Sequence, residues 1–348
     1  MKILYTGIRF EHYNPRRRES FEYNNFYLTL AAMPGVEVVE HPFDRILEVG
    51  KKKYNEELLA LVEKEKPSAL FAFMYTDELD PATLLRIKDK CGVTTIAWFA
   101  DDYWRFFNYS KYWPPYFHYV VTTYSKAVGW YKAKGFNNIL RSQWACNSHV
   151  YRPTDLPKDI EVSFVGQYKS KRAAVIEDLK RRGINVQTYG FGWPNGKVSQ
   201  DEMLRIFSRS KINLNLNVRP SIFHPKVLAR IFLKKSINKV VPDYHLIDNV
   251  SAWRHFSTLH THARPFELAG CKAFTISGLS EDIPDSYVDG KEMVFYRTTD
   301  ELVEKIRYYL AHEDERERIA RAGYDRTMRE HTYEKRFEEV FRRAGIGK

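Results

Sequence analysis

The sequence has few cysteines and no long apolar run, and both absences exclude classes of protein. Its three cysteines, Cys91, Cys146 and Cys271, form an odd, scattered set with neither a disulfide framework nor a metal-binding spacing. No stretch approaches about 18 uncharged apolar residues, so no membrane-spanning helix is expected. The apolar run in the opening MKILYTGIRF is too short for a secretory signal and has no small-residue cleavage site after it. We therefore expect a cytoplasmic protein.

The chain also lacks the short motifs of several nucleotide and metal enzymes. No G-x-G-x-x-G follows the first apolar run, which argues against a dinucleotide-dependent dehydrogenase. No G-x-x-x-x-G-K-[ST] occurs, which argues against a P-loop NTPase. H-E-x-x-H and G-x-S-x-G are absent as well. Because the histidines are scattered along the chain, we expect no metal site.

The composition is that of an ordinary globular protein with an excess of positive charge. Of the 348 residues, 44% are hydrophobic and 28% charged, which excludes disordered and low-complexity scaffolds. At about 150 residues per domain, the length predicts two domains. Lys and Arg number 55 against 44 Asp and Glu, a net charge of +11. Such a charge suits nucleic acid, an anionic membrane or a phosphorylated ligand, and alone it does not choose among them.

Short apolar runs alternate with helical patterns in the first half of the chain. This alternation predicts βαβ units around a parallel sheet. Pro81 suits the first turn of a helix that Asp80 caps. The expected strands are 1–7, 36–39, 69–74, 94–99, 119–122 and 139–143, and the expected helices are 20–33, 54–64, 81–91 and 125–134.

The same alternation restarts after a Pro-containing stretch at 151–158 and predicts a second α/β domain. We expect a mixed α/β fold with two Rossmann-like domains that face each other across a cleft. Residues 1–152 form the first domain, on the acceptor side, and 153–330 the second, on the donor side, with an insertion at 218–261. Residues 331–348 form a C-terminal helix that returns to the first domain. In the second half the expected strands are 160–165, 186–189, 212–216 and 273–276, and the expected helices are 172–182, 201–208, 264–269, 299–324 and 334–344.

In open α/β sheets ligands bind beyond the carboxyl ends of the strands, and two segments there carry candidate residues. Gly166, Lys169 and Arg172 lie where a strand ends and a helix begins. Glycine permits close backbone approach and helix N-terminal amides attract anions, so a diphosphate could bind here. The alternative is a solvated basic first turn. In the second segment, Glu267 could accept hydrogen bonds from two ribose hydroxyls, or it could be a surface residue paired with Arg264.

Several segments, in order, resemble the two-domain GT-B glycosyltransferases. The similarity is greatest to the spore-maturation CgeB-like branch, which is related to glycosyltransferase family 4. Arg264–Ala273 resembles the R-x-F-E-x-x-A-x-G segment of that family, which includes Phe266 and Glu267. The other matching segments are W-F-A-D-D at 98–102, F-V-G…R at 164–172, I-N-L-N at 212–215 and the terminal helices at 322–341.

The resemblance implies transfer of a hexose from a nucleotide-diphosphate sugar to an acceptor hydroxyl. The donor would be a UDP-, GDP- or dTDP-sugar, held mainly by the second domain. Glu267 would bind the ribose, and Arg264, Lys169 and Arg172 would lie near the diphosphate. The loop that contains Gly190 could line the base pocket. Fixed cations would stabilise the leaving group in place of a metal, so we expect metal independence and no cofactor.

The chain departs from the family at one position and leaves the catalytic base open. Family 4 proteins carry E-x7-E, and here Leu259 replaces the first Glu, so retaining and inverting chemistry both remain possible. An inverting enzyme needs a base for the acceptor hydroxyl. A carboxylate at Asp101 or Asp102 could serve, and only one of them is expected to face the cleft because adjacent strand residues point in opposite directions. Alternatively, the two residues cap the next helix or bind a backbone turn. His12, in an Arg-rich loop, is a further candidate or an ordinary loop histidine.

Two further segments carry expectations about the acceptor. The aromatic-rich stretch 104–119 follows Asp101 and Asp102, and its rings could stack on an acceptor sugar. In the insertion, 225–240 could form a basic amphipathic helix. It would either pack on the second domain or bind an anionic membrane as a peripheral contact at the inner face. The acceptor is expected to be a saccharide, a lipid-linked group or another hydroxyl.

Two other functions remain as alternatives to a glycosyltransferase. The +11 charge with interleaved aromatics could indicate a nucleic-acid-binding protein, although no known module for specific nucleic-acid binding is visible. The missing first Glu could indicate a two-domain scaffold that binds a nucleotide without catalysis.

Overall fold

The structure is a computed structural model that describes residues 1–347 and divides the chain into two compact units. The first unit combines residues 1–143, 221–258 and 334–348, and the second combines 144–220 and 259–333. The two α/β domains expected from the sequence are therefore present, but their boundaries differ. The first unit ends at Gln143 instead of 152, and most of the insertion groups with the first unit and not with the second.

The first unit is built on a six-stranded parallel sheet in the order β2-β1-β3-β4-β5-β6. Its six strands match those expected from the sequence, whereas the short helices α2 and α5 were not expected. A π-helical stretch at Tyr23–Tyr27 precedes α1. The strands are β1 (Lys2–Thr6), β2 (Glu37–Glu40), β3 (Ala69–Phe73), β4 (Thr94–Phe99), β5 (Tyr119–Thr122) and β6 (Ile139–Arg141). The helices are α1 (Leu28–Ala32), α2 (Ile46–Val49), α3 (Lys51–Glu65), α4 (Pro81–Lys90), α5 (Asp102–Arg105), α6 (Ser125–Ala133) and α14 (Tyr333–Arg343).

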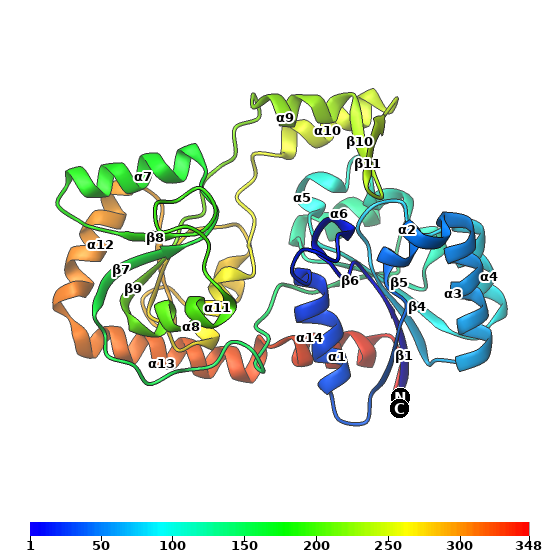
Figure 1. The fold of residues 1–348 in the computed structure, drawn as a ribbon, viewed down its shortest axis with the longest axis horizontal. Helices are drawn as coiled ribbons and strands as arrows, with labels where there is room; N and C mark the ends of the chain where they lie inside the picture. Colours follow the sequence, from blue (N-terminus) through cyan, green and yellow to red (C-terminus); the bar gives the residue numbers. More distant parts are fainter. Residues whose placement is uncertain (348) are drawn as a thin grey trace. The chain divides into compact units, whose positions relative to one another are not determined.

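Every residue of β3 is buried because helices cover both faces of this sheet (Figure 1). Leu70 and Ala72 belong to a core that includes residues of α3 and α4. Phe71, which lies between them, points to the opposite face, because successive side chains of a strand alternate between faces. Its ring packs against that of Phe337, with the ring centres 5.6 Å apart. Phe337 comes from α14, so the expected return of the C-terminal helix to the first domain is confirmed.

The second unit contains a five-stranded parallel sheet in the order β13-β12-β9-β7-β8. Its core again lies on both faces of the sheet, with α7 and α12 contributing to one cluster and α8 and α11 to the other. The strands are β7 (Ile160–Val165), β8 (Gln187–Tyr189), β9 (Ser210–Asn215), β12 (Thr275–Gly278) and β13 (Val294–Tyr296). The helices are α7 (Ser170–Arg181), α8 (Gln200–Arg209), α11 (Arg264–Gly270), α12 (Thr299–Ala311) and α13 (Glu313–Glu330).

The insertion differs from its sequence-based prediction. A helix over 225–240 was expected, but α9 (Pro225–Leu228) ends after one turn. An antiparallel hairpin follows, with β10 (Leu233–Ser236) and β11 (Lys239–Pro242), and then α10 (Leu246–His255). The adjacent β-branched residues Val240 and Val241 favour a strand over a helix, a local signal that the apolar spacing at 227–232 obscured.

The insertion packs on the first unit through polar contacts with two loops. At the hairpin turn, the Ser236 hydroxyl donates to Asp77 at 3.0 Å and the Ile237 N–H donates to the Thr76 hydroxyl at 2.9 Å. From α10, Asn249 accepts a hydrogen bond from the Asn108 side chain at 2.8 Å. Packing of this segment on the second domain, one of the two arrangements considered from sequence, is therefore wrong. None of the helices within residues 1–347 combines the length and apolarity that crossing a bilayer requires.

Replacement of Phe337 tests whether α14 is part of the first unit. Phe337→Ala removes ring contacts with Phe26, Phe71 and Trp98, and should lower the free energy of unfolding by about 3–5 kcal/mol. Urea unfolding followed by circular dichroism measures this loss. Arg342→Ala, at an exposed position of the same helix, is the control and should change stability by less than about 0.5 kcal/mol. Equal stability of Phe337→Ala and the wild type would contradict this packing.

Candidate functional site

The second unit brings two glycine-containing loops together at the carboxyl ends of β7 and β8. Gly190 has a φ of +126°, and a Cβ atom on it would lie 2.2 Å from the Gly166 carbonyl oxygen. The Gly166 N–H donates to the Tyr189 carbonyl at 2.9 Å, and the Trp193 indole donates to the Gly166 carbonyl at 2.9 Å. Only glycine fits at position 190, which lets the two backbones run in contact.

Two cations follow the first of these loops. Lys169 immediately precedes α7, and Arg172 lies in its first turn. The Arg172 guanidinium donates to the carbonyls of Leu216 at 3.0 Å and Gln167 at 3.1 Å. Burial and the charge of Arg172 lower the pKa of Lys169. Within residues 1–347, no carboxylate forms an ion pair with either cation, so both charges are available to an anion at the N-terminus of the helix.

Arg264 and Glu267 form a buried ion pair on α11. Their side chains are joined by a 2.7 Å contact between Nη1 and Oε2, and Glu267 is only 4% exposed. The pairing at this spacing was the alternative considered from sequence, but the pair lies in the interior and not on the surface. Burial and the charge of Arg264 lower the pKa of Arg172, which indicates that the two guanidinium groups lie near each other. The second unit therefore groups Lys169, Arg172, Arg264 and Glu267.

Two aromatic residues of this region differ from the sequence-based prediction of the donor site. Phe266 is fully buried, and the centre of its ring lies 5.5 Å from that of Tyr287 and 5.7 Å from that of His331. The structure therefore places Phe266 in the core. Tyr296, at the end of β13, was not identified from sequence. Its buried hydroxyl has no hydrogen-bond partner within residues 1–347, and the charge of Arg172 lowers its pKa in opposition to the larger effect of burial, which raises it. An unsatisfied buried hydroxyl beside these cations suits a ligand contact.

A cavity of about 820 Å³ lies in the first unit, at the carboxyl ends of β3 and β4 and beneath the hairpin. Its wall combines aromatic and cationic side chains and includes Asp101. The aromatic residues are Tyr75, Trp104, Tyr109, Tyr112, Trp113 and Tyr116, and the cations are Arg105, Lys226, Arg230, Lys234 and Lys235. The aromatic stretch and the basic insertion thus meet at one cavity. That the insertion forms one of its walls was not apparent from sequence.

The three residues considered as a catalytic base have different environments. Asp101 is partly exposed and lines the cavity. Asp102 is fully buried, where it accepts hydrogen bonds from the hydroxyls of Ser110 at 2.5 Å and Tyr131 at 3.1 Å, and burial raises its pKa. His12 is exposed, has a φ of 59° and does not line the cavity. Of the three, only Asp101 is placed to contact a ligand in this cavity.

Stacked cations form one side of the cavity. The Arg105 guanidinium lies 4.0 Å from the centre of the Tyr109 ring and donates to the Tyr75 carbonyl at 2.6 Å. The Arg230 guanidinium lies 4.7 Å from the Trp104 ring. Lys235, from the hairpin, donates to the Tyr75 hydroxyl at 2.8 Å. Aromatic faces and fixed donors of this kind suit sugar rings and their hydroxyls.

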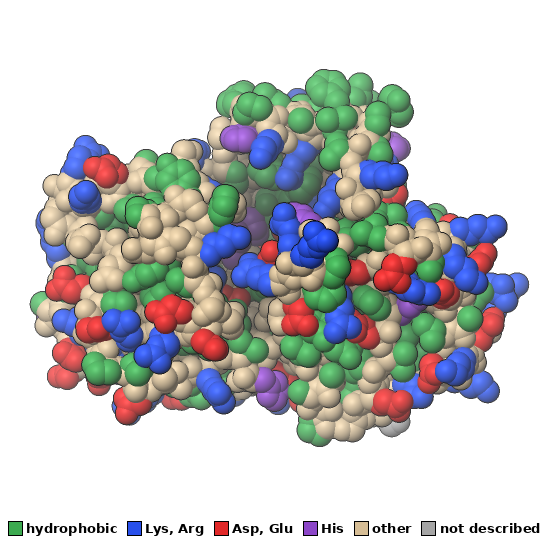
Figure 2. Space-filling view, viewed as in Figure 1, with side chains coloured by type: hydrophobic (Ala, Val, Ile, Leu, Met, Phe, Trp, Pro, Cys, Tyr) green, Lys and Arg blue, Asp and Glu red, His purple; other side chains and the backbone are tan. Residues whose placement is uncertain are grey.

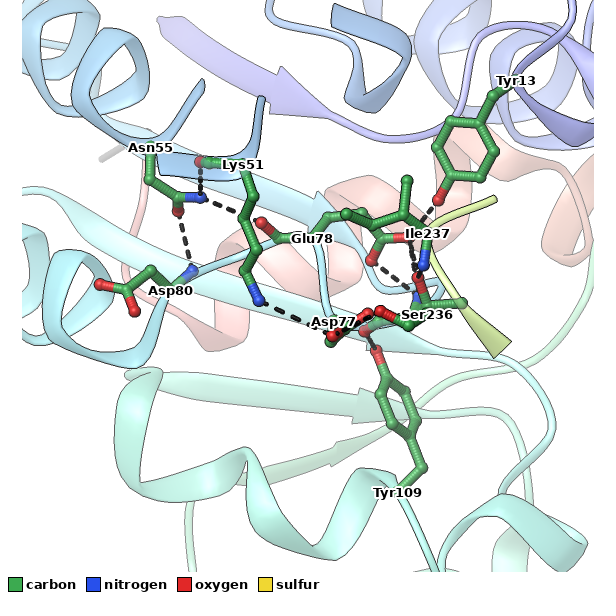
Figure 3. Close-up of polar contacts among 10 residues, drawn as sticks. Tyr13, Lys51, Asn55, Asp77, Glu78, Asp80, Tyr109, Ser236 and Ile237 are labelled. Carbon is green, nitrogen blue, oxygen red and sulfur yellow. Dashed lines mark hydrogen bonds and ion pairs between the residues drawn. The ribbon is translucent and has the colours of Figure 1, made fainter. Parts of the chain in front are cut away.

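The loop between β3 and α4 is held by a buried carboxylate, Glu78, that sequence reasoning did not identify (Figure 3). Glu78 accepts hydrogen bonds from the Thr76 N–H at 2.7 Å and from the Tyr13 hydroxyl. Asn55 donates to the Glu78 carbonyl at 3.0 Å and accepts from the Asp80 N–H at 2.8 Å. Burial raises the pKa of Glu78 despite these bonds. The acidic run at 77–80, in the loop that follows β3, was the available signal.

Glu22 is a second carboxyl group that the sequence did not single out. Burial raises its pKa to about 7, and the charge of Asp101 contributes to the shift. A group that titrates near neutrality beside a cavity residue is a functional candidate. Within residues 1–347, no three His, Cys, Asp or Glu side chains are grouped so that they could hold a metal ion.

Comparison with known families and structures gives a consistent picture. Residues 235–342 match a family model described as glycosyl transferase-like, which covers 108 of the 348 residues. No curated protein sequence matches the chain. The matched segment begins within β10 and includes β11, Arg264, Glu267 and the helices α12 and α13.

Solved glycosyltransferase structures share the fold along the whole chain. A glycosyltransferase from Rickettsia africae has a TM-score of 0.59 and 10% identity, covering 100% of this chain and 99% of its own. Sucrose-phosphate synthase from Thermosynechococcus elongatus has a TM-score of 0.61 and 10% identity, covering 99% and 98%. Anabaena HepE, solved with UDP-glucose, has a TM-score of 0.59 and 8% identity, covering 99% of each chain. The expected GT-B fold with two Rossmann-like domains is confirmed, whereas membership of the CgeB-like branch stays a prediction.

Glu22→Gln tests the shifted carboxyl group through the pH dependence of stability. The pKa is about 7 in the folded chain against 4.5 in the unfolded one, so the folded state holds its proton more tightly. Between these values the wild type loses stability as pH rises, by roughly 3 kcal/mol at most, and the variant lacks this loss. In urea unfolding at pH 4.5 and pH 8, the free energy of unfolding of the variant relative to the wild type should be higher at pH 8 than at pH 4.5. The same stability difference at both pH values would contradict the shift.

Proposed function

We propose that the chain is a glycosyltransferase that moves a hexose from a nucleotide-diphosphate sugar to a hydroxyl of an acceptor. One observation carries the proposal: within residues 1–347, Lys169 and Arg172 of the second unit form no ion pair, and the buried carboxylate of Glu267 belongs to the same group of residues. Lys169 and Arg172 would hold the diphosphate, and Glu267 would accept hydrogen bonds from the ribose. The shared fold supports this assignment, since HepE is similar over its whole length and was solved with UDP-glucose.

The donor region favours a diphosphate over other anions on physical grounds. In the described chain Arg172 is half-buried without an ion-pair partner, which is costly for a charged group, and a bound anion would offset that cost. Lys169 and Arg172 lie at the start of α7, whose N–H groups add positive potential. The loop at Gly190 would contact the base. Arg264 already pairs with Glu267 at 2.7 Å, so we assign it to orienting this carboxylate and to adding positive charge near the diphosphate.

Acceptor binding is assigned to the aromatic cavity of the first unit, with Asp101 as the base. The acceptor hydroxyl would lose its proton to the Asp101 carboxylate as its oxygen forms a bond to the anomeric carbon. The bond from that carbon to the diphosphate oxygen breaks, and the nucleoside diphosphate leaves with the electron pair. Lys169 and Arg172 would stabilise the negative charge of the leaving group without a metal. This route inverts the anomeric configuration, which proton NMR of the product would report.

Lys169→Met tests the donor site. Loss of one charge-assisted contact should weaken nucleoside diphosphate binding about tenfold or more. Isothermal titration with UDP, GDP and dTDP, each with and without EDTA, measures the effect and identifies the base. The control Lys180→Met changes a lysine in the last turn of the same helix and should bind as the wild type does. Tight binding of duplex DNA with a steep salt dependence, and no nucleotide binding, would favour a nucleic-acid-binding protein instead.

Asp101→Asn tests the base. The variant should lower kcat by about 10²–10⁴-fold because the amide cannot accept the proton, while nucleotide affinity stays unchanged. The rate is measured by chromatography of the nucleoside diphosphate that the donor releases in the presence of each of a panel of acceptors. Asp89→Asn, an exposed carboxylate on α4, is the matched control and should retain full activity. Wild-type rates in the Asp101 variant would remove this role, and nucleotide binding by the wild type without any turnover would favour a scaffold.

A further inference from the structure

Large apolar side chains are concentrated on the outer surface of the insertion. Within residues 1–347, six large hydrophobic side chains are at least 60% exposed, and five of them lie between 223 and 247. They are Phe223 (72%), Phe232 (60%), Val240 (70%), Tyr244 (87%) and Ile247 (84%). Val240 also lines the cavity of the first unit, which leaves the other four for an interaction surface. Figure 2 shows apolar side chains gathered over the segment that carries α9, α10 and the hairpin, at the top of the view. An exposed apolar patch of this kind marks an interaction surface.

The same segment carries a net positive charge. Residues 221–258 contain six Lys and Arg and two Asp, which gives +4. Both carboxylates are engaged, because Asp243 contacts His245 at 2.7 Å and Asp248 pairs with Lys111 at 2.6 Å. Lys239 and Arg254 are exposed, and no carboxylate within residues 1–347 forms an ion pair with them. The insertion surface, defined as 221–258, is therefore both apolar and cationic.

We propose that the insertion surface binds an anionic lipid bilayer. Its apolar side chains would enter the boundary between headgroups and acyl chains, while Lys239 and Arg254 contact anionic headgroups. Burial of apolar side chains and attraction of basic residues to anionic lipid act together in peripheral binding. The aromatic Tyr244 presents both an apolar ring and a hydroxyl, the combination that suits a membrane interface. This proposal is independent of the proposed sugar transfer.

Other occupants fit the insertion surface less well. In a twofold contact between two copies, each would bring the same +4 charge against the other, and the repulsion opposes association. A nucleic acid would satisfy the cations, but its phosphates give no gain from burying side chains such as Phe232 and Ile247. An anionic bilayer offers an apolar phase and negative charge at the same surface, and neither a second copy nor a nucleic acid does.

Vesicle co-sedimentation of the full chain tests the proposal. The wild type should bind vesicles of 30% phosphatidylglycerol in phosphatidylcholine at least tenfold more tightly than pure phosphatidylcholine, and 0.5 M salt should weaken this binding. The double variant Phe232→Ser/Ile247→Ser should lose binding at least tenfold, as should Lys239→Glu/Arg254→Glu. The controls Val288→Ser and Lys52→Glu change exposed residues outside the insertion surface and should bind as the wild type does. Unchanged melting temperatures would show that the variants fold.

Three results would overturn the proposal. One is a wild type that binds neither kind of vesicle, and another is equal binding of the wild type and the two double variants. The third is a dimer, detected by light scattering, that Phe232→Ser/Ile247→Ser dissociates, because the surface would then bind a second copy. Nucleotide affinity is measured in the same samples, so a failure of lipid binding is distinguishable from a failure of the proposed sugar transfer.

Discussion

The buried carboxylate of Glu78 holds the loop on which the cavity of the first unit depends. It accepts hydrogen bonds from Thr76 and Tyr13, and the same loop accepts the hairpin turn through Thr76 and Asp77. An ionisable group is retained in the interior only where its hydrogen bonds offset the cost of burial. Ile237 is held at the turn with a φ of 52°, a costly conformation for a β-branched residue. The cavity wall thus depends on one acid that no solvent reaches.

Parallel strand order explains why the candidate residues converge although they lie far apart in the sequence. All strands of a parallel sheet end at one edge, so the loops after β7 and β8 meet, as do those after β3 and β4. In the second unit this edge gathers glycine backbone, cations and the pair of Arg264 and Glu267. In the first it gathers aromatic rings and Asp101. Under the proposed function, the second unit would bind the anionic donor and the first unit the acceptor.

Much of the fold was predictable from sequence because its signals are local. Buried parallel strands read as short apolar runs, and Asp80 caps α4 by accepting from the Thr83 N–H at 3.1 Å, as its position before Pro81 suggested. The hairpin was not predictable from apolar spacing, because 227–232 fits a helix while the tertiary contacts of Ser236 and Ile237 determine a turn. Burial separated Asp101 from Asp102 and placed Phe266 in the core. Glu22, Glu78 and Tyr296 acquire their character from burial in the folded chain, which sequence alone does not reveal.

The central claim is that the second unit binds a nucleoside diphosphate through its own cations. Thermal melting of the wild type with UDP, GDP, dTDP and ADP, each with and without EDTA, tests it most directly. A ligand at about 100 times its Kd stabilises the folded chain by about 2.7 kcal/mol, which raises the Tm by several degrees. One diphosphate should give such a rise, and EDTA should leave it unchanged. A flat response to every nucleotide would contradict it.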